Sequence, residues 1–212
     1  MDAERRQRQE EKANTWTHLV GLVCSVIGSI LLLTKVLPTY DWRSLLGVLT
    51  YASSLMLMFT TSTLMHSLPE GEKKERYIKY DHMAIYLCIA GTYTPFLMIT
   101  VQTEHSMLLL AGIWVCAGIG VLWKYYFTGR YVIWSTLIYL LLGWSALWVW
   151  GPLQDSLTGA GLVWLLAGGA AYSIGTIFFL WRKLMHHHAI WHVFVILGAA
   201  CHYVCMWQYV FA

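Results

Sequence analysis

Five histidines and one aspartate inside apolar segments carry the side chains from which this chain could build a reaction centre. They are His18, His66, His82, His188, His192 and Asp81. Ionisable groups are costly to place in lipid, and a shared layer of them is therefore a functional-site hypothesis in its own right. Imidazoles and carboxylates are ligands that zinc accepts. The residue types predict a zinc centre, provided that the helices bring these side chains to one depth.

The spacing of the histidines indicates which of them share a metal ion. His188 and His192 are four residues apart, so they lie on one face of a helix and can reach the same ion. His66 comes from another segment of the chain. A catalytic zinc ion usually has three protein ligands and one open position for water, whose pKa it lowers to about 7. We therefore predict His66, His188 and His192 as the metal ligands.

The other polar residues of this layer predict the chemistry. Asp81 is the only one of the eleven acidic residues inside the start of an expected membrane span. We expect it to accept the proton of the water, the alternative being that it caps a helix at the interface. Ser62, one helical turn before a predicted ligand, is expected to hydrogen-bond the water or an oxyanion. Asn14, His18 and His82 are expected to orient these groups. The predicted reaction is metal-assisted hydrolysis of a lipid amide or ester.

The composition predicts the elements that carry these residues. Of the 212 residues, 58% are hydrophobic and 12% are charged, whereas a soluble domain has about 25% charged residues. A membrane-spanning helix needs about 20 apolar residues. We predict an all-α polytopic membrane protein, with a tail over residues 1–15 and a single transmembrane domain over residues 16–212. Its seven helices are expected at 16–37, 44–67, 80–101, 106–127, 131–150, 157–181 and 189–211.

The distribution of positive charge predicts the orientation of these helices. Twelve of the fourteen Lys and Arg residues fall on the side of the N-terminus. They are Arg5, Arg6, Arg8, Lys12, Lys73, Lys74, Arg76, Lys79, Lys124, Arg130, Arg182 and Lys183. Positive charge remains in the cytoplasm, so we expect the N-terminus inside and the C-terminus outside. The polar layer then lies within about two helical turns of the cytoplasmic face.

Several other residues are given no role in the predicted site. The five cysteines lie in apolar runs without a CxxC spacing and are interpreted as small buried apolar side chains. His202 lies ten residues beyond His192, about 15 Å along a helix, and is expected to hydrogen-bond within the bundle. His105 is expected in a solvated outer connection. The net charge of +3 does not suggest a nucleic acid partner, and nothing in the sequence indicates the oligomeric state.

These motifs match a known family over nearly the whole chain. The chain resembles the hemolysin III proteins, the bacterial branch of the progestin and adipoQ receptor (PAQR) family. The matching segments are Glu11-x-x-Asn14-x-x-Thr17-His18-x-x-Gly21, Ser62-x-x-x-His66, Asp81-His82 followed by Ile89-Ala-Gly-Thr-Tyr-Thr-Pro95, and His188-Ala-Ile-Trp-His192 ending in Cys201-His202-Tyr203.

The resemblance implies a seven-helix fold in the bacterial inner membrane, with zinc near the cytoplasmic face. It assigns the zinc ligands to His66, His188 and His192, a carboxylate facing the water to Asp81, and a serine to Ser62. Eukaryotic relatives look like lipid-amide hydrolases of the ceramidase type, which makes membrane lipid the expected partner.

Two other functions remain open from the sequence. One is a sensor or regulator of membrane state in which zinc has only a structural role. The other is a pore-forming cytolysin, as the family name implies. A pore needs a polar lining through the full thickness of the membrane, whereas the outer halves of the expected helices are almost purely apolar.

Overall fold

The computed structural model describes residues 3–211, which fold into helices joined by short connections. The helices are α1 (Ala3–Val36), α2 (Trp42–Ser67), α3 (Glu72–Pro95), α4 (Glu104–Phe127), α5 (Val132–Gly143), α6 (Trp150–Ser156), α7 (Gly159–Leu180) and α8 (His187–Cys205). Short π-helical turns extend α3 and α8, and a 3₁₀ turn joins α5 to α6. Seven stretches of the described chain are long and apolar enough to cross a membrane. The predicted all-α fold with seven membrane-spanning helices is confirmed.

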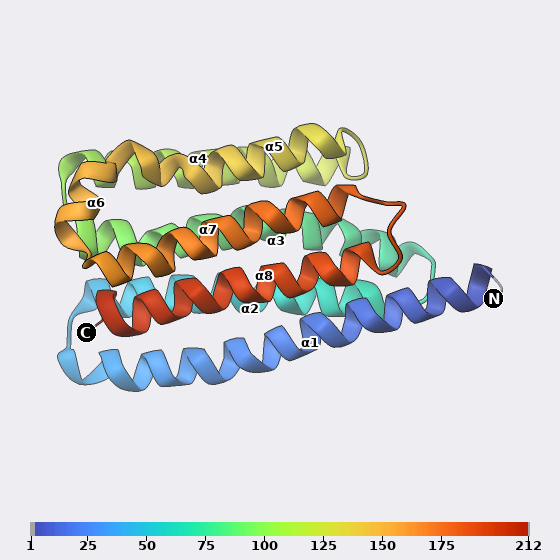
Figure 1. The fold of residues 1–212 in the computed structure, drawn as a ribbon, viewed down its shortest axis with the longest axis horizontal. Helices are drawn as coiled ribbons and strands as arrows, with labels where there is room; N and C mark the ends of the chain where they lie inside the picture. Colours follow the sequence, from blue (N-terminus) through green and yellow to red (C-terminus); the bar gives the residue numbers. More distant parts are fainter. Residues whose placement is uncertain (1–2, 212) are drawn as a thin grey trace.

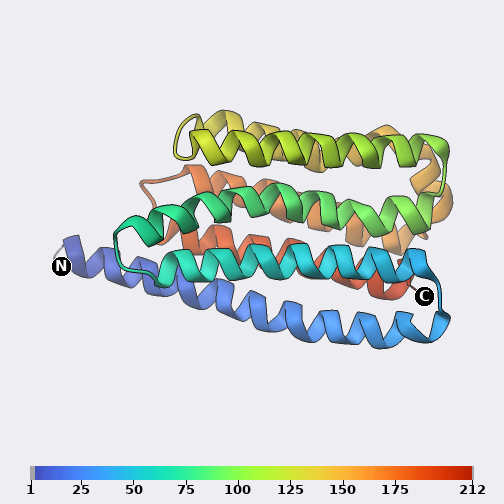
Figure 2. The same ribbon diagram turned by 180° about the vertical axis from the view of Figure 1, so that it is seen from behind.

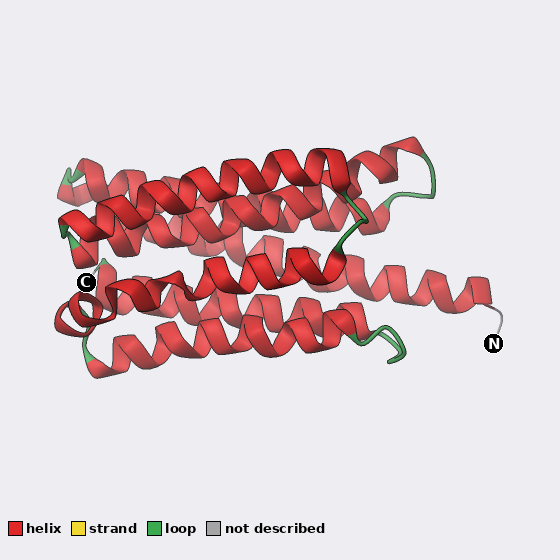
Figure 3. Ribbon diagram, turned by 90° about the horizontal axis from the view of Figure 1, so that it is seen from above, coloured by secondary structure: helices red, strands yellow, loops and turns green. Residues whose placement is uncertain are grey.

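The helices form two layers, with α1 along one edge. In Figure 1, α5, α7 and α8 lie in front of α4, α3 and α2, and Figure 2 shows the same bundle from behind. α1 packs against both α2 and α8 and so closes the bundle on one side. Seen from above, the long helices run nearly parallel (Figure 3). The N-terminus and the α2–α3, α4–α5 and α7–α8 connections lie at one end (Figure 1), here termed the N-terminal end.

Two helices begin many residues earlier than the sequence predicted. α1 starts at Ala3, so most of the expected tail is helical and extends beyond the bundle (Figure 1). α3 starts at Glu72, inside a charged stretch that was expected to be a connection as far as Lys79. Glu, Lys, Arg, Gln and Ala are all strong helix formers, which explains why the helices continue past their apolar parts. Asp81 therefore lies well inside α3, and its interpretation as a helix cap is wrong.

Side chains at the helix ends fix where the connections turn. The Asp41 carboxylate accepts hydrogen bonds from the backbone N–H groups of Arg43 and Ser44, at 3.2 and 3.0 Å, and from the Ser44 hydroxyl. These hydrogen bonds lower the pKa of Asp41 below its ordinary value. Thr103 and Ser106 form a capping box at the start of α4. Such caps satisfy backbone donors that a helix leaves without a partner.

Glycines let α7 and α8 approach each other closely. A Cβ atom on Gly175 would lie 2.7 Å from the Cβ of Phe194, and a Cβ on Gly198 would lie 2.7 Å from the ring of Tyr172. Neither distance leaves room for a side chain, so the two helices pack backbone against ring. This packing determines the position of the histidines at the start of α8 relative to the cavity wall formed by α7.

Candidate metal centre

Three histidines from two helices converge at the N-terminal end of the bundle. His66 lies in the last turn of α2, while His188 and His192 lie in the first turns of α8. One ligand atom from each of the three side chains lies within 4.8 Å of the other two. The ring centroids are 4.6 to 5.1 Å apart and the rings meet edge to face. His66 and His192 are buried and His188 is half-buried. The predicted convergence is confirmed, and the three imidazoles could hold a metal ion.

In two of these rings a hydrogen bond at one nitrogen leaves the other nitrogen free to bind a metal. His66 Nδ1 lies 2.6 Å from a Glu11 carboxylate oxygen, which can only accept, so Nδ1 carries the proton. His192 Nδ1 lies 3.2 Å from the backbone carbonyl oxygen of Asn14 and 3.0 Å from the Thr17 hydroxyl. In both rings Nε2 then keeps its lone pair, and His66 Nε2 is buried without a hydrogen-bond partner. Metal-binding histidines are commonly oriented in this way, so these residues fit a metal ion.

A second charged group holds the carboxylate that contacts His66. Lys74 Nζ lies 2.6 Å from Glu11 Oε1, the oxygen that His66 does not use, and 2.9 Å from Glu70 Oε1. Lys74 is only 5% exposed, which is unusual for a lysine. The sequence prediction missed Glu11 and Lys74 as site residues. The signal for Glu11 was its position on one helical stripe with Asn14 and His18, three and seven residues later.

The two α1 residues predicted to orient the ligands lie against His192. The His18 ring stacks on the His192 ring, with centroids 3.4 Å apart and planes 17° apart, and its other neighbour is the edge of Phe59. Both ring nitrogens of His18 are buried without a hydrogen-bond partner. Asn14 contacts His192 through its backbone carbonyl, and its side-chain oxygen is buried and unpartnered. Packing against His18 and the bond from Nδ1 together fix the His192 ring.

Asp81, Ser62 and His82 line the same cavity as His18, His188 and His192. The Ser62 hydroxyl is buried without a hydrogen-bond partner. His82 Nδ1 donates to the backbone oxygen of Ile78 at 2.7 Å and lies 3.8 Å from Asp81 Oδ2. The Tyr139 hydroxyl donates to the backbone oxygen of His82 at 3.0 Å, which anchors this part of α3 to α5. Of the predicted site residues, all but His66 and Asn14 line this one cavity.

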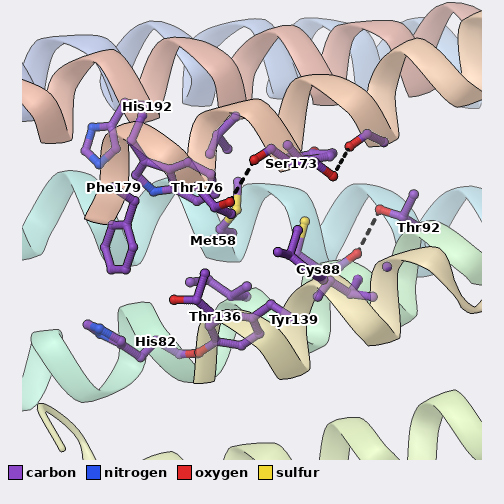
Figure 4. A pocket seen from close by; sticks show the side chains of 18 of the residues that line it. Met58, His82, Cys88, Thr92, Thr136, Tyr139, Ser173, Thr176, Phe179 and His192 are labelled. Atoms are coloured by element: carbon purple, nitrogen blue, oxygen red, sulfur yellow. Dashed lines mark hydrogen bonds between the residues drawn. The ribbon is translucent and has the colours of Figure 1, made fainter. Parts of the chain in front are cut away.

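The cavity that these residues line has a volume of about 160 Å³ and lies mainly between α3, α5, α7 and α8. Figure 4 places His192 and His82 toward one end of it and Thr92 toward the other. Along α3 the lining runs from Asp81 to Tyr93, which is about 18 Å of helix. Away from the histidine cluster the lining is mostly apolar, with Ile85, Ile89, Leu140 and Val195, and it includes the polar side chains of Thr92, Ser173 and His202. The site thus has one end rich in histidines and a longer remainder that is mostly apolar.

His202 lies farther along α8, as the sequence predicted. Its Nε2 donates to the backbone oxygen of Leu165 at 3.2 Å, which confirms the expected hydrogen bond within the bundle. His202 also lines a second cavity of about 70 Å³, which shares Tyr93 and Trp144 with the first.

The fold and the site define a multi-pass integral membrane protein with a buried three-histidine site that could hold a metal ion. The chain belongs to the haemolysin III family, because the family model described as "Haemolysin-III related" matches residues 6–203. It is 42% identical to Hemolysin-3 of Bacillus cereus over 95% of this chain and 92% of the relative. It is 37% identical to the Hemolysin-3 homolog of Bacillus subtilis (strain 168), over 95% and 94% of the two chains.

More distantly, the chain is 29% identical to the human Monocyte to macrophage differentiation factor, over 95% of this chain and 85% of the relative. That protein is a distant PAQR relative, so the predicted place of this chain in the family is confirmed. No solved structure matches the chain.

Proposed function

We propose that this protein is a zinc-dependent hydrolase that cleaves an amide or ester bond of a membrane lipid. The observation that carries the proposal is the set of three converging imidazoles, two of which line a mostly apolar cavity together with Asp81 and Ser62. A lipid substrate suits this shape, because its polar linkage and its hydrocarbon chain need different surroundings. We further propose that the N-terminal end faces the cytoplasm of a bacterium, with the helices in its inner membrane.

His66, His188 and His192 would hold the zinc ion. When bound, zinc polarises a carbonyl group and lowers the pKa of water at its open position. Asp81 accepts a proton from the attacking water and returns it to the leaving amine or alcohol. The Ser62 hydroxyl, which has no hydrogen-bond partner in the protein, donates to the carbonyl oxygen as negative charge develops there.

The surrounding residues orient this set and exclude water. His82 is fixed by its bond to Ile78, which holds the backbone beside Asp81 in place. His18 and Asn14 keep the His192 ring from rotating, through stacking and a hydrogen bond. The apolar lining removes bulk water from the polar end, and electrostatic interactions are stronger where water is excluded.

A regulator with structural zinc is the second candidate, because the site joins three helices. Glu11 and Thr17 of α1 contact His66 of α2 and His192 of α8, so a bound ion would add a link at the same junction. A cytolytic pore is less well supported, because the cavity lining is mostly apolar beyond the histidines. A reproducible step conductance in planar bilayers would favour the pore instead.

The experiment compares zinc content and lipid turnover in purified wild type, Asp81→Asn and Ser62→Ala. Asp155→Asn is a matched control, because Asp155 is exposed in α6 and lies outside the cavity. A general base contributes about 10²- to 10⁴-fold to a rate. We expect Asp81→Asn to lower the rate of fatty acid release about 100-fold or more while zinc content is unchanged.

The two candidate functions give different outcomes in this comparison. If zinc-loaded wild type turns over no lipid and only His66→Ala loses stability, the structural role of zinc is favoured. Turnover that Asp81→Asn leaves unchanged contradicts the assignment of the base. Elemental analysis of wild type beside His188→Ala identifies the metal and tests the ligand set.

A further inference from the structure

A chain of charged groups outside the three predicted ligands ends on one of them. Each carboxylate oxygen of Glu11 in α1 accepts a hydrogen bond of 2.6 Å from a different partner. Oε2 accepts from His66 Nδ1, and Oε1 accepts from Lys74 Nζ. Lys74 belongs to the first turn of α3 and also contacts Glu70, which lies in the α2–α3 connection. The chain therefore runs from the N-terminal surface of the bundle to the buried imidazole of His66.

The geometry restrains the carboxylate in two ways. A carboxylate held by one partner can rotate about its last bond, whereas two partners on different helices fix both oxygens. The Lys74 side chain is 7% exposed and that of Glu11 is 28% exposed, so both charges are largely removed from water. Removing one partner of a buried ion pair leaves the other charge uncompensated, which is strongly unfavourable. Glu11 therefore depends on Lys74 to stay where it meets His66.

The contact with Glu11 determines which nitrogen of His66 is available. A carboxylate accepts a proton donor at Nδ1, and neutral imidazole then presents its lone pair at Nε2. His66 Nε2 is buried and has no partner within the protein. An outer carboxylate of this kind orients the ring and makes a histidine a better donor to a metal.

We propose that Glu11 is a positioning residue for His66, and that Lys74 keeps Glu11 in that position. Metal affinity then depends on an ion pair between α1 and α3 that touches none of the space the ion would occupy. This inference rests on the proposed zinc site and adds that zinc affinity depends on Glu11 and Lys74, which do not bind the ion. A simple salt bridge between helices would contribute to stability and leave zinc affinity and the His66 tautomer unchanged.

The test measures zinc affinity by competition with a chelator in detergent-solubilised full-length protein. Glu11→Gln keeps the size of the side chain and removes its charge, and Lys74→Met removes the ammonium group. Loss of an outer partner of a ligand typically lowers metal affinity about 10- to 100-fold, and we expect Glu11→Gln to fall in that range. Lys74→Met should have a smaller effect in the same direction. The double variant should equal Glu11→Gln, because Lys74 acts only through Glu11.

Matched controls come from exposed ion pairs between residues four apart on α1 and on α3. Glu4→Gln breaks the exposed pair with Arg8 on α1, and Arg76→Met breaks the exposed pair with Glu72 on α3. Both should bind zinc as wild type does. Lys74→Arg keeps a cation beside Glu11 and should retain most of the affinity, which keeps the test decisive if Glu11→Gln does not fold.

Nitrogen NMR of histidine-labelled, metal-free protein supplies a readout that a purely structural role would not move. In wild type the His66 signal, identified by its loss in His66→Ala, should show a protonated Nδ1 and a bare Nε2. In Glu11→Gln the two tautomers should mix, because an amide can donate as well as accept.

Two results distinguish failure of this inference from failure of the proposed function. If wild type binds zinc, and Glu11→Gln and Lys74→Met bind it within twofold of wild type with an unchanged tautomer, the positioning role is wrong while the zinc site stands. If wild type binds no zinc, the proposed function is overturned and this inference with it.

Discussion

Adding one methyl group at Gly21 should disturb the histidine cluster from a distance. Gly21 of α1 faces the Phe59 ring of α2, and a Cβ on Gly21 would overlap that ring, with two ring carbons at 2.8 Å. Phe59 is 2% exposed and its ring meets His18 edge to face at 5.1 Å between centroids. His18 in turn stacks on His192. The Phe59 ring cannot move away from Gly21 without displacing this stack.

The size of the effect follows from two opposing contributions in Gly21→Ala. Overpacking of a well-packed core costs about 1–3 kcal/mol. Alanine in place of glycine inside a helix stabilises by up to about 1 kcal/mol. Gly112→Ala in α4 isolates the second contribution, because a Cβ on Gly112 meets nothing within 4 Å. The free energies of unfolding of the two variants should therefore differ by about 1–3 kcal/mol, with Gly21→Ala the less stable.

Reversible unfolding in mixed detergent micelles measures this difference, and chelator competition on the same samples measures zinc affinity. Gly21→Ala should lower both, and adding Phe59→Leu should restore part of each by making room. Equal stability of Gly21→Ala and Gly112→Ala would refute the claim that Phe59 cannot yield. Lower stability with unchanged zinc affinity would refute the connection through His18.

Three further predictions concern a buried lysine, an exposed aspartate and the location of the C-terminus. Lys124 is 1% exposed and donates to the Ser135 hydroxyl at 2.7 Å, and no carboxylate of residues 3–211 lies within ion-pair distance of it. Because an unpaired buried charge is unfavourable, Lys124→Met should raise the free energy of unfolding. A Lys124→Met variant less stable than wild type would contradict this prediction. The lowered pKa of Asp41 means that its stabilising effect is present above its ordinary value of 3.8 and disappears as the pH falls through the lowered value. The difference in melting temperature between wild type and Asp41→Ala should therefore become smaller as the pH is lowered. We expect the C-terminus outside, so alkaline phosphatase fused there should be active in cells and green fluorescent protein fused there should be dark.

The sequence predicted the histidine cluster because the spacing of the histidines and the positions of the charged residues can both be read directly from the sequence. The four-residue spacing of His188 and His192 is a property of any helix, and the biased positions of lysine and arginine assign depth to each span. Together they require His66 to lie at the level of the α8 pair, as the structure shows. Rotation of each helix about its own axis is not encoded in such a pattern. For that reason the sequence did not reveal that Asn14 would meet His192 through its backbone oxygen.

Glu11 and Lys74 were missed for a different physical reason. Both occur in strongly charged stretches, where exposure to water is the ordinary expectation for such side chains. Their burial depends on α1 and α3 continuing as helices past their apolar parts, and on both helices passing the same point of α2. The first condition can be inferred from helix propensity, but the second depends on how three helices pack. A charged stretch beside a membrane helix therefore deserves a search for partners of nearby intramembrane histidines.

The location of the site at one end of the bundle follows from what a histidine in a membrane needs as a partner. Mid-bilayer charges are costly, so a histidine there is restricted to neutral partners. His202 lies about 15 Å farther along α8 than His192, and its hydrogen bond goes to the neutral backbone oxygen of Leu165. At the N-terminal end, α1 and α3 extend toward water and can bring a carboxylate and an ammonium group together beside His66. A histidine ligand that needs an anionic partner at its outer nitrogen can therefore obtain one at this end of the helices at a lower free-energy cost than at the level of His202.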